Sequence, residues 1–280
     1  MRIAVIGLGL IGGSLAWDWT QAGHEVWGLS RNPETTRYAQ DQGIISGSLK
    51  ELGELAGEDW DVVAVCTPIG EVLPTIAALA EVVAPTTTVT DVASVKGSLV
   101  RSATALCAGF VGGHPMAGTA AQGIRAAQRG LFQGAVYALT PLPQTQTLGL
   151  QRLEKLIRDL GAEALICDPD EHDQAVAAIS HLPVWVSAAL IATASQQGSL
   201  AWRLASSGFR DTSRVGGGNP QLGVGMAQAN QQALLGQLQR YQAHLAQIQT
   251  WIEQGNWDCL RALLEQTQRQ RQQFRGCRSS

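Results

Sequence analysis

The sequence has 280 residues, of which 45% are hydrophobic, and its formal net charge is −3. This length favours two domains with a buried apolar core, and the slightly negative charge gives no reason to expect a nucleic acid or an anionic membrane as a partner. The five cysteines are scattered and form no CxxC pair, so they indicate neither a disulfide framework nor a metal site. No uninterrupted run of 18 apolar residues occurs, and we expect a soluble, cytoplasmic protein.

The start of the chain carries the pattern of a β–α–β unit. Arg2 to Ile6 is predicted to be a buried strand, Ser14 to Gln21 a helix and Glu25 to Leu29 a second strand. The glycines between the first strand and the helix have the GxGxxG spacing, which permits a tight turn, close approach of a pyrophosphate and close packing of helix on strand. The unit predicts a dinucleotide site; the alternative is a tight turn without a ligand. The residues expected to bind the cofactor are Gly7, Gly9, Leu10, Ile11 and Gly12.

The end of the second predicted strand indicates which dinucleotide binds. An NAD site usually has Asp or Glu there, about 20 residues past the glycines, to bind the ribose hydroxyls. Here the strand runs into Ser30-Arg31-Asn32, with no acid. Ser30 can donate a hydrogen bond to a 2′-phosphate, and the Arg31 guanidinium can pair with that phosphate and stack on adenine. The pattern favours NADP; the alternative is that Arg31 is a solvated loop cation.

The α/β alternation continues beyond Arg31. We predict helices from Pro33 to about Gln42 and from Val95 to Leu106, and strands over Trp60–Cys66 and Thr86–Thr90. Loops at the carboxyl ends of strands line the ligand crevice of an open α/β sheet. We therefore expect Cys66, Thr67 and Pro68 to contact the cofactor; the alternative is an ordinary turn between a strand and a proline, without a ligand. Ser94, just past the next strand, either presents its hydroxyl to the crevice or only caps the following helix.

A histidine stands among glycines and prolines in the segment Phe110-Val-Gly-Gly-His114-Pro-Met-Ala-Gly-Thr119. We predict one or two strand residues followed by a loop that holds His114. A buried structural histidine usually sits within a helix or strand, so a loop position favours a functional role for His114. His24, His172 and His244 fall in ordinary loop or helix contexts, and no role is assigned to them.

The alternation of strands and helices ends near Asp168. Strands are predicted at Val136–Leu139 and Ala164–Cys167, with a helix over Gly149–Leu160 between them. We predict an α/β N-terminal Rossmann dinucleotide-binding domain, residues 1–168, and an all-α C-terminal substrate and dimerisation domain, residues 169–280. The helices predicted in the second domain are Glu171–Ala178, Leu182–Gln197, Pro220–Gln232, Gln232–Gln254 and Trp257–Phe274.

The long C-terminal helices are rich in glutamine and poor in charge. One of them carries apolar residues at 3–4 spacing, an amphipathic stripe. Such a surface favours packing against a second subunit, and a purely intramolecular core is the alternative. The stripe consists of Leu234, Leu235, Leu238, Tyr241, Leu245, Ile248 and Trp251.

Taken together, several motifs resemble the prephenate/arogenate dehydrogenases of tyrosine biosynthesis, over nearly the whole chain. The resemblance implies a Rossmann domain followed by a helical domain that forms an intertwined dimer. It also implies that His114 is the base for the ring 4-hydroxyl and that Ser94 hydrogen-bonds nearby. Three further residues are implied to bind the substrate: Arg214, which holds a carboxylate, His181 and Thr119. The motifs are GLGLIGGS, Asp91-Val-Ala-Ser94-Val-Lys96, Gly113-His114-Pro-Met-Ala-Gly118-Thr119, Ser180-His181-Leu-Pro183 and Gly208-Phe-Arg-Asp211-Thr-Ser-Arg214.

The chain departs from the prephenate-preferring pattern of this family in two places. Many such enzymes have a second histidine three residues after the position of His181, where this chain has Val184. Many also have Glu after the Gly-Thr of the histidine segment, where this chain has Ala120. Both differences remove a polar side chain that could bind a pyruvyl group. Combined with Ser30 and Arg31, they favour an NADP-dependent arogenate dehydrogenase, with prephenate as the alternative substrate.

Two other classes share part of this pattern. The β-hydroxyacid dehydrogenases and imine reductases also join a Rossmann domain to a helical dimerisation domain, but they usually rely on lysine or aspartate in the helical domain. No lysine follows Lys155 in this chain, which speaks against the lysine-dependent members. An NADP-sensing protein without catalytic activity would need the glycine turn but not Ser94, His114 and Arg214.

Overall fold

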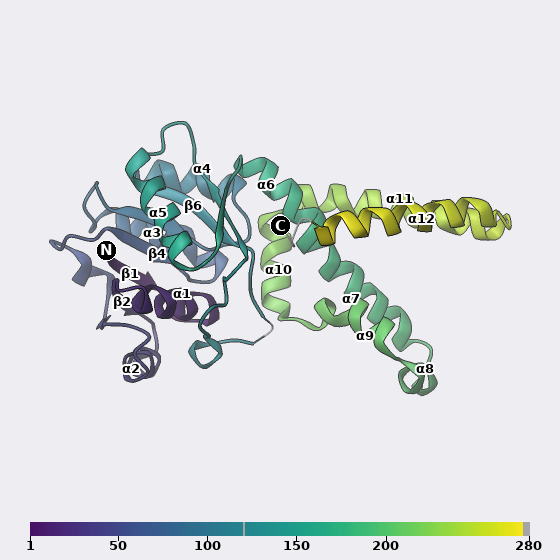
Figure 1. The fold of residues 1–280 in the computed structure, drawn as a ribbon, viewed down its shortest axis with the longest axis horizontal. Helices are drawn as coiled ribbons and strands as arrows, with labels where there is room; N and C mark the ends of the chain where they lie inside the picture. The colour runs from purple at the N-terminus through teal and green to yellow at the C-terminus, as the bar shows by residue number, and fades with distance from the viewer. Residues whose placement is uncertain (120, 277–280) are drawn as a thin grey trace. The chain divides into compact units, whose positions relative to one another are not determined.

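The computed structural model describes residues 1–119 and 121–276, and Ala120 lies outside the described residues. The chain forms two compact units, Met1–Gln231 and Gln232–Ser280, which we describe separately. The first unit contains the sheet and the helices that follow it as far as α10 (Figure 1). The division of the chain after Asp168 into a Rossmann domain and a helical domain, which the sequence favours, remains a prediction.

An eight-stranded sheet lies at the centre of the first unit, with strand order β3-β2-β1-β4-β5-β6-β7-β8. Neighbouring strands are parallel except for β6 and β7, which are antiparallel. This arrangement confirms the predicted Rossmann-like α/β class. The strands are β1 Arg2–Ile6, β2 Glu25–Leu29, β3 Gly47–Leu49, β4 Val62–Val65, β5 Thr88–Asp91, β6 Phe110–Pro115, β7 Val136–Thr140 and β8 Glu163–Ile166.

Helices cover both faces of the sheet because its central strands are apolar on both sides. Ile3 and Val5 of β1 pack into a core with α1 and α5, whereas Ala4 and Ile6 pack into a second core with α3 and α4. Successive side chains of a strand point to opposite faces, so one strand contributes to both cores. The helices around the sheet are α1 Leu10–Gln21, α2 Pro33–Asp41, α3 Ile69–Ala80, α4 Gly97–Leu106 and α5 Thr147–Asp159.

The segment around His114 corrects one prediction. His114 is not in a loop but within strand β6, where it pairs with Ala138 of β7. The preceding glycines are needed for close packing, since a Cβ on Gly112 would lie 2.6 Å from Val100 Cγ2 and a Cβ on Gly113 would lie 2.8 Å from the Asp91 carbonyl oxygen. Glycine inside a strand often marks such a close backbone approach and not a loop.

The start of α4 corrects a second prediction. The helix begins at Gly97, its N-cap is Lys96, and no side chain caps it. Ser94 lies in the preceding bend and is half-buried. The capping alternative for Ser94 is therefore wrong, because Lys96, and not Ser94, occupies the N-cap position.

Beyond β8, the described part of the first unit contains helices and no strand, as predicted. Asp168 caps the first of these helices by accepting hydrogen bonds from the backbone N–H groups of Asp170 and Glu171, and Pro169 occupies its first turn. A π-helical turn, Ala177–His181, joins α6 to α7. The helices are α6 Pro169–Val176, α7 Leu182–Ser195, α8 Ser199–Leu204, α9 Ser207–Ser213 and α10 Pro220–Ala229.

One helical run in the described residues, Pro169–Ser195, is long and apolar enough to cross a membrane by length and composition alone. Polar residues interrupt this segment, so it contains no uninterrupted run of 18 apolar residues. Core helices of soluble proteins pass the same test, so this run is weak evidence for a membrane span.

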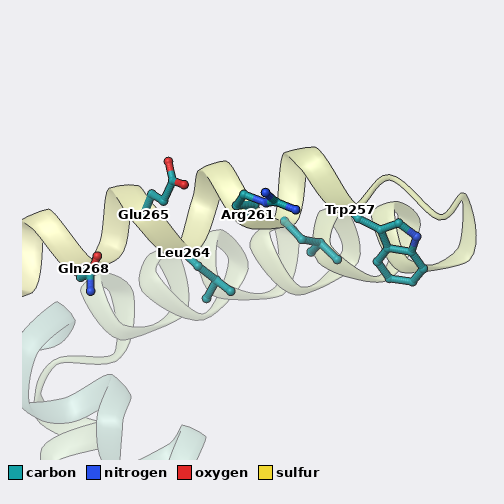
Figure 2. Close-up of a pocket in the computed structure, with 6 residues that line it drawn as sticks. Trp257, Arg261, Leu264, Glu265 and Gln268 are labelled. Carbon is teal, nitrogen blue, oxygen red and sulfur yellow. The ribbon is translucent and has the colours of Figure 1, made fainter.

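The second unit is a pair of long helices, α11 Gln231–Glu253 and α12 Trp257–Gly276 (Figure 1). Large apolar side chains remain exposed on both helices, among them Leu235, Leu245, Ile252, Trp257 and Leu264. Figure 2 shows a shallow hollow on α12, where Leu264 and Glu265 point to opposite sides of the helix. The two helices of the second unit therefore leave apolar side chains uncovered.

Candidate active site

The glycine turn between β1 and α1 has the geometry of an anion cradle. Gly7 has φ +103°, a conformation that favours glycine. A Cβ on Gly12 would lie 2.8 Å from Cys66 Cβ, so only glycine lets α1 approach β4 this closely, whereas a Cβ on Gly9 would meet nothing within 4 Å. No side chain caps α1 and its first turn contains no acid, so its N–H groups are available to a phosphate. Leu10 and Ile11 begin this helix and are half-buried.

The end of β4 lies directly beside this turn. A Cβ at Gly7 would lie only 2.7 Å from the Cys66 carbonyl oxygen, so the two backbones approach closely here. The Thr67 hydroxyl is buried and has no hydrogen-bond partner, and Pro68 lines a cleft of about 690 Å³ between α3 and α10. The structure therefore brings Cys66, Thr67 and Pro68 together with the glycines, and these residues fit a dinucleotide.

Ser30 and Arg31 follow the last residue of β2 on the same edge of the sheet. Ser30 is half-buried and Arg31 is exposed. Leu29, which precedes them, accepts a hydrogen bond of 2.8 Å from the Gly7 backbone N–H. The backbone that leads into Ser30 and Arg31 is thus held next to the glycine turn, the position from which an NAD enzyme usually presents its acid to the ribose.

A buried chain of hydrogen bonds runs from His114 to a residue pair that the sequence does not single out. His114 Nδ1 lies 2.9 Å from His172 Nε2, and His172 Nδ1 lies 2.9 Å from Asp173 Oδ1. His114 is 8% exposed and His172 is 5% exposed. The view of His172 as an ordinary histidine is therefore wrong. The available signal was an adjacent His-Asp pair in the first helix after the last strand.

Asp173 and Asn230 tie this chain to its surroundings. The Asp173 carboxylate accepts hydrogen bonds from the backbone N–H groups of Lys96, at 2.7 Å, and Gly97, at 2.8 Å. The Asn230 amide donates to the Asp173 carbonyl oxygen, at 2.8 Å, and lies 3.3 Å from His181 Nδ1. His181 Nε2 is buried without a partner. His181 thus belongs to the same cluster as His114.

A buried ion pair completes the cluster. Lys96 Nζ contacts Asp91 Oδ2, and both side chains are fully buried. Asp91 also accepts hydrogen bonds from the backbone N–H groups of Ala93, at 2.9 Å, and Gly113, at 3.1 Å. A carboxylate therefore holds each end of the loop that carries Ser94. Asp91 binds the backbone at Ala93, and Asp173 binds it at Lys96 and Gly97.

The pKa of His114 lies well below its ordinary value of 6.5. Burial is the main cause, because it disfavours the charged imidazolium, and the electrostatic effects of Lys96, His172 and His181 act in the same direction. Burial likewise lowers the pKa of His181. His114 is consequently neutral at neutral pH, as a proton acceptor must be.

The remaining predicted residues lie apart from these contacts. Thr119 is exposed, and its hydroxyl accepts a hydrogen bond from the backbone N–H of Ala121. Arg214 is exposed at the start of a 3-10 turn that Ser187 of α7 holds through hydrogen bonds to Thr212 and Gly216. Ser94, Thr119 and Arg214 have no contact with His114 among the described interactions, so their roles remain predictions.

Known proteins resemble this chain in sequence and fold. A family model for the prephenate dehydrogenase nucleotide-binding domain matches residues 15–166, and one for the prephenate dehydrogenase dimerization domain matches residues 168–266. Arogenate dehydrogenase of Synechocystis is 47% identical with a TM-score of 0.87, over 98% of this chain and 100% of that one. A prephenate dehydrogenase of A. aeolicus, solved with hydroxyphenyl propionate and NAD+, is 25% identical with a TM-score of 0.92, over 98% of each chain.

Prephenate dehydrogenase of Bacillus subtilis is 30% identical over 262 residues, which cover 90% of this chain and 70% of the relative. The two family models together match most of the chain, and their boundary falls at the capping residue of α6. The chain belongs to the prephenate/arogenate dehydrogenase family of oxidoreductases.

Proposed function

We propose that this chain is an NADP-dependent arogenate dehydrogenase, which converts arogenate to tyrosine with loss of CO2. The observation that carries the proposal is the buried, neutral His114 in a family whose substrates bear a ring hydroxyl. The 47% identity to an arogenate dehydrogenase supports the choice of substrate. So does Val184, an apolar residue where prephenate-preferring relatives often carry histidine. Prephenate is the alternative substrate.

The chemistry assigns a task to each residue. His114 takes the proton of the C4 hydroxyl as the ring carbonyl forms, and returns it to the phenolate oxygen after CO2 leaves C1. The bound nicotinamide supplies the acceptor for the hydride that leaves C4. Ser94 orients the hydroxyl, and Arg214 pairs with a substrate carboxylate. His181 and Thr119 complete the substrate site. Because the ring becomes aromatic, the protein mainly has to align the reactants and provide one base.

The choice of NADP rests on the end of β2. Ser30 and Arg31 offer a hydroxyl and a guanidinium where an NAD enzyme usually has a carboxylate. The guanidinium of Arg31 is exposed and is available to a 2′-phosphate. The family match supports a nicotinamide dinucleotide, and the A. aeolicus relative was solved with NAD+.

The test of this function compares arogenate and prephenate, each with NADP and with NAD, by the absorbance of the reduced cofactor at about 340 nm. We expect the highest kcat/KM with arogenate and NADP. A preference for prephenate would replace the proposed substrate, and equal efficiency with the two cofactors would remove the role of Ser30 and Arg31. Oxidation of a β-hydroxyacid alone, or no turnover of any substrate, would favour the other enzyme class or a cofactor sensor.

We also propose a homodimer formed through the helical region, which extends from Asp168, the cap of α6, to the C-terminus. The match of residues 168–266 to a dimerization domain supports it. So do the exposed apolar residues of α11 and α12, because monomers rarely leave such large patches uncovered. Sedimentation equilibrium should give the mass of two chains; a folded, active monomer at micromolar concentration would contradict the proposal.

A further inference from the structure

We propose that His172 and Asp173 form a positioning relay that holds the proton of His114 on Nδ1 and leaves Nε2 as the atom that accepts the substrate proton. The inference rests on the proposed function of His114 as a base. It adds two residues that touch neither the glycine turn nor the reacting atoms, and it assigns the protonation of each ring.

The direction of the relay starts from Asp173. An ionised carboxylate can only accept hydrogen bonds, and that of Asp173 accepts two from the backbone N–H groups of Lys96 and Gly97. The contact of 2.9 Å with His172 Nδ1 therefore requires that Nδ1 carry the proton. In neutral His172 the other nitrogen, Nε2, is then an acceptor.

The second link follows from the first. His172 Nε2 lies 2.9 Å from His114 Nδ1, so an accepting Nε2 requires the proton of His114 to be on Nδ1. His114 Nε2 is left with its lone pair. The alternative is a cationic His172 that donates to His114 Nδ1, which would place the remaining proton on Nε2 and remove the base. The proposed role of His114 as a base requires the first assignment, and the tautomer of His114 distinguishes the two.

The charges around the pair support the same assignment. The ammonium of Lys96, before α4, opposes a positive charge on His114. Asp173 faces His172 directly, and Asp91 of β5 is paired with Lys96. The negative charges are thus bound by other partners, and neither carboxylate hydrogen-bonds to His114. His114 has a single described side-chain hydrogen bond, the one to His172.

Local structure fixes the relay in place. The Asp168 cap and Pro169 set where α6 begins, which places His172 and Asp173 one turn later. A Cβ on Gly97 would lie 2.9 Å from Asp173 Oδ2, so glycine at this position lets the carboxylate reach the N-terminus of α4. The relay therefore connects the strand that holds the base to the first helix after the sheet.

The first measurement needs no catalysis. Histidine-selective ¹⁵N labelling of the full-length protein, with His114→Asn used for assignment, reports which ring nitrogen of His114 carries the proton. We expect the Nδ1–H tautomer in the native protein at neutral pH, and a mixture of tautomers in His172→Leu. A native His114 protonated on Nε2 would overturn the relay.

The second measurement is kinetic. His172→Leu should lower kcat roughly 10- to 100-fold, because the base loses its orientation, with little change in KM or cofactor affinity. His172→Gln should restore a large part of kcat, since its side-chain oxygen can accept from His114 Nδ1. His24→Leu is the matched control: His24 is also buried and lies 2.8 Å from a carboxylate, that of Asp159, but outside the cluster, so kcat should stay unchanged.

A folded His172→Leu protein with unchanged kcat would contradict the relay. Loss of cofactor affinity in the same proportion as kcat would also contradict it, because it would indicate a general structural role. If the native protein oxidises neither arogenate nor prephenate, the proposed function fails, while the tautomer of His114 still decides whether the relay exists.

Discussion

The cofactor turn and the histidine cluster of the first unit are built in opposite ways. The turn is one continuous stretch, Gly7 to Gly12, with uncapped N–H groups and open space at Gly9. The cluster joins β5, β6, α6 and the loop before α4, and its charged groups are buried and paired. Substitutions beside the turn should therefore change ligand binding alone, whereas substitutions in the cluster should change catalysis or stability.

The largest effect is expected for His114→Asn. Loss of the general base should lower kcat by roughly 10²–10⁴, while NADP binding should be unchanged, because the glycine turn, Ser30 and Arg31 remain intact. Steady-state kinetics and titration calorimetry with NADP separate the two quantities. A folded variant with near-normal kcat on arogenate would remove His114 from the mechanism and make the cluster purely structural.

Lys96→Met tests the structural side of the cluster. It leaves the fully buried carboxylate of Asp91 without its ion-pair partner, which should cost about 3–5 kcal/mol of stability. The matched control is Arg101→Met, because the Arg101–Asp170 pair is exposed and should contribute only about 0–1 kcal/mol. Urea unfolding measures both; similar losses would show that burial does not distinguish the two pairs.

Ser30→Asp combined with Arg31→Ala tests the cofactor side. The added carboxylate should repel a 2′-phosphate and bind ribose hydroxyls, which shifts the preference toward NAD by roughly 1–3 kcal/mol for each charged hydrogen bond lost or gained. The ratio of kcat/KM for the two cofactors measures the shift. Arg158→Ala, which removes an exposed cation from α5, should leave that ratio unchanged. Stability should be close to native in both variants.

The smallest effect is a displacement of the pH profile. The base must be neutral, and its pKa is lowered well below 6.5 by burial first and then by Lys96, His172 and His181. The activity that depends on neutral His114 is thus fully present at neutral pH, and it is lost only as the pH falls through that lowered pKa. A profile of kcat/KM from about pH 5 to pH 8 checks this; half-maximal activity at or above 6.5 would contradict it.

Much of the first unit could be predicted because its signals are local. The apolar runs of β1 and β2, the glycine spacing and the Asp168-Pro169 cap each act over a few residues. Elements with weaker local signals were harder to identify: β3 is only three residues long, and Pro74 lies inside α3. The prediction of a loop at His114 is wrong because glycine commonly signals a loop, whereas Gly112 and Gly113 allow close packing within β6.

The sequence by itself determined the dinucleotide turn, the lack of an acid after β2 and the family motifs, since each depends on residues adjacent in the chain. Only the tertiary structure decided the partners of His114. His172 is 58 positions away, and it reaches His114 because Asp173 binds the backbone at the start of α4. The lowered pKa of His114 likewise depends on burial and on Lys96 and His181, which lie near it but belong to other elements. Contacts between distant residues depend on how helices pack against the sheet, and no local pattern encodes that packing.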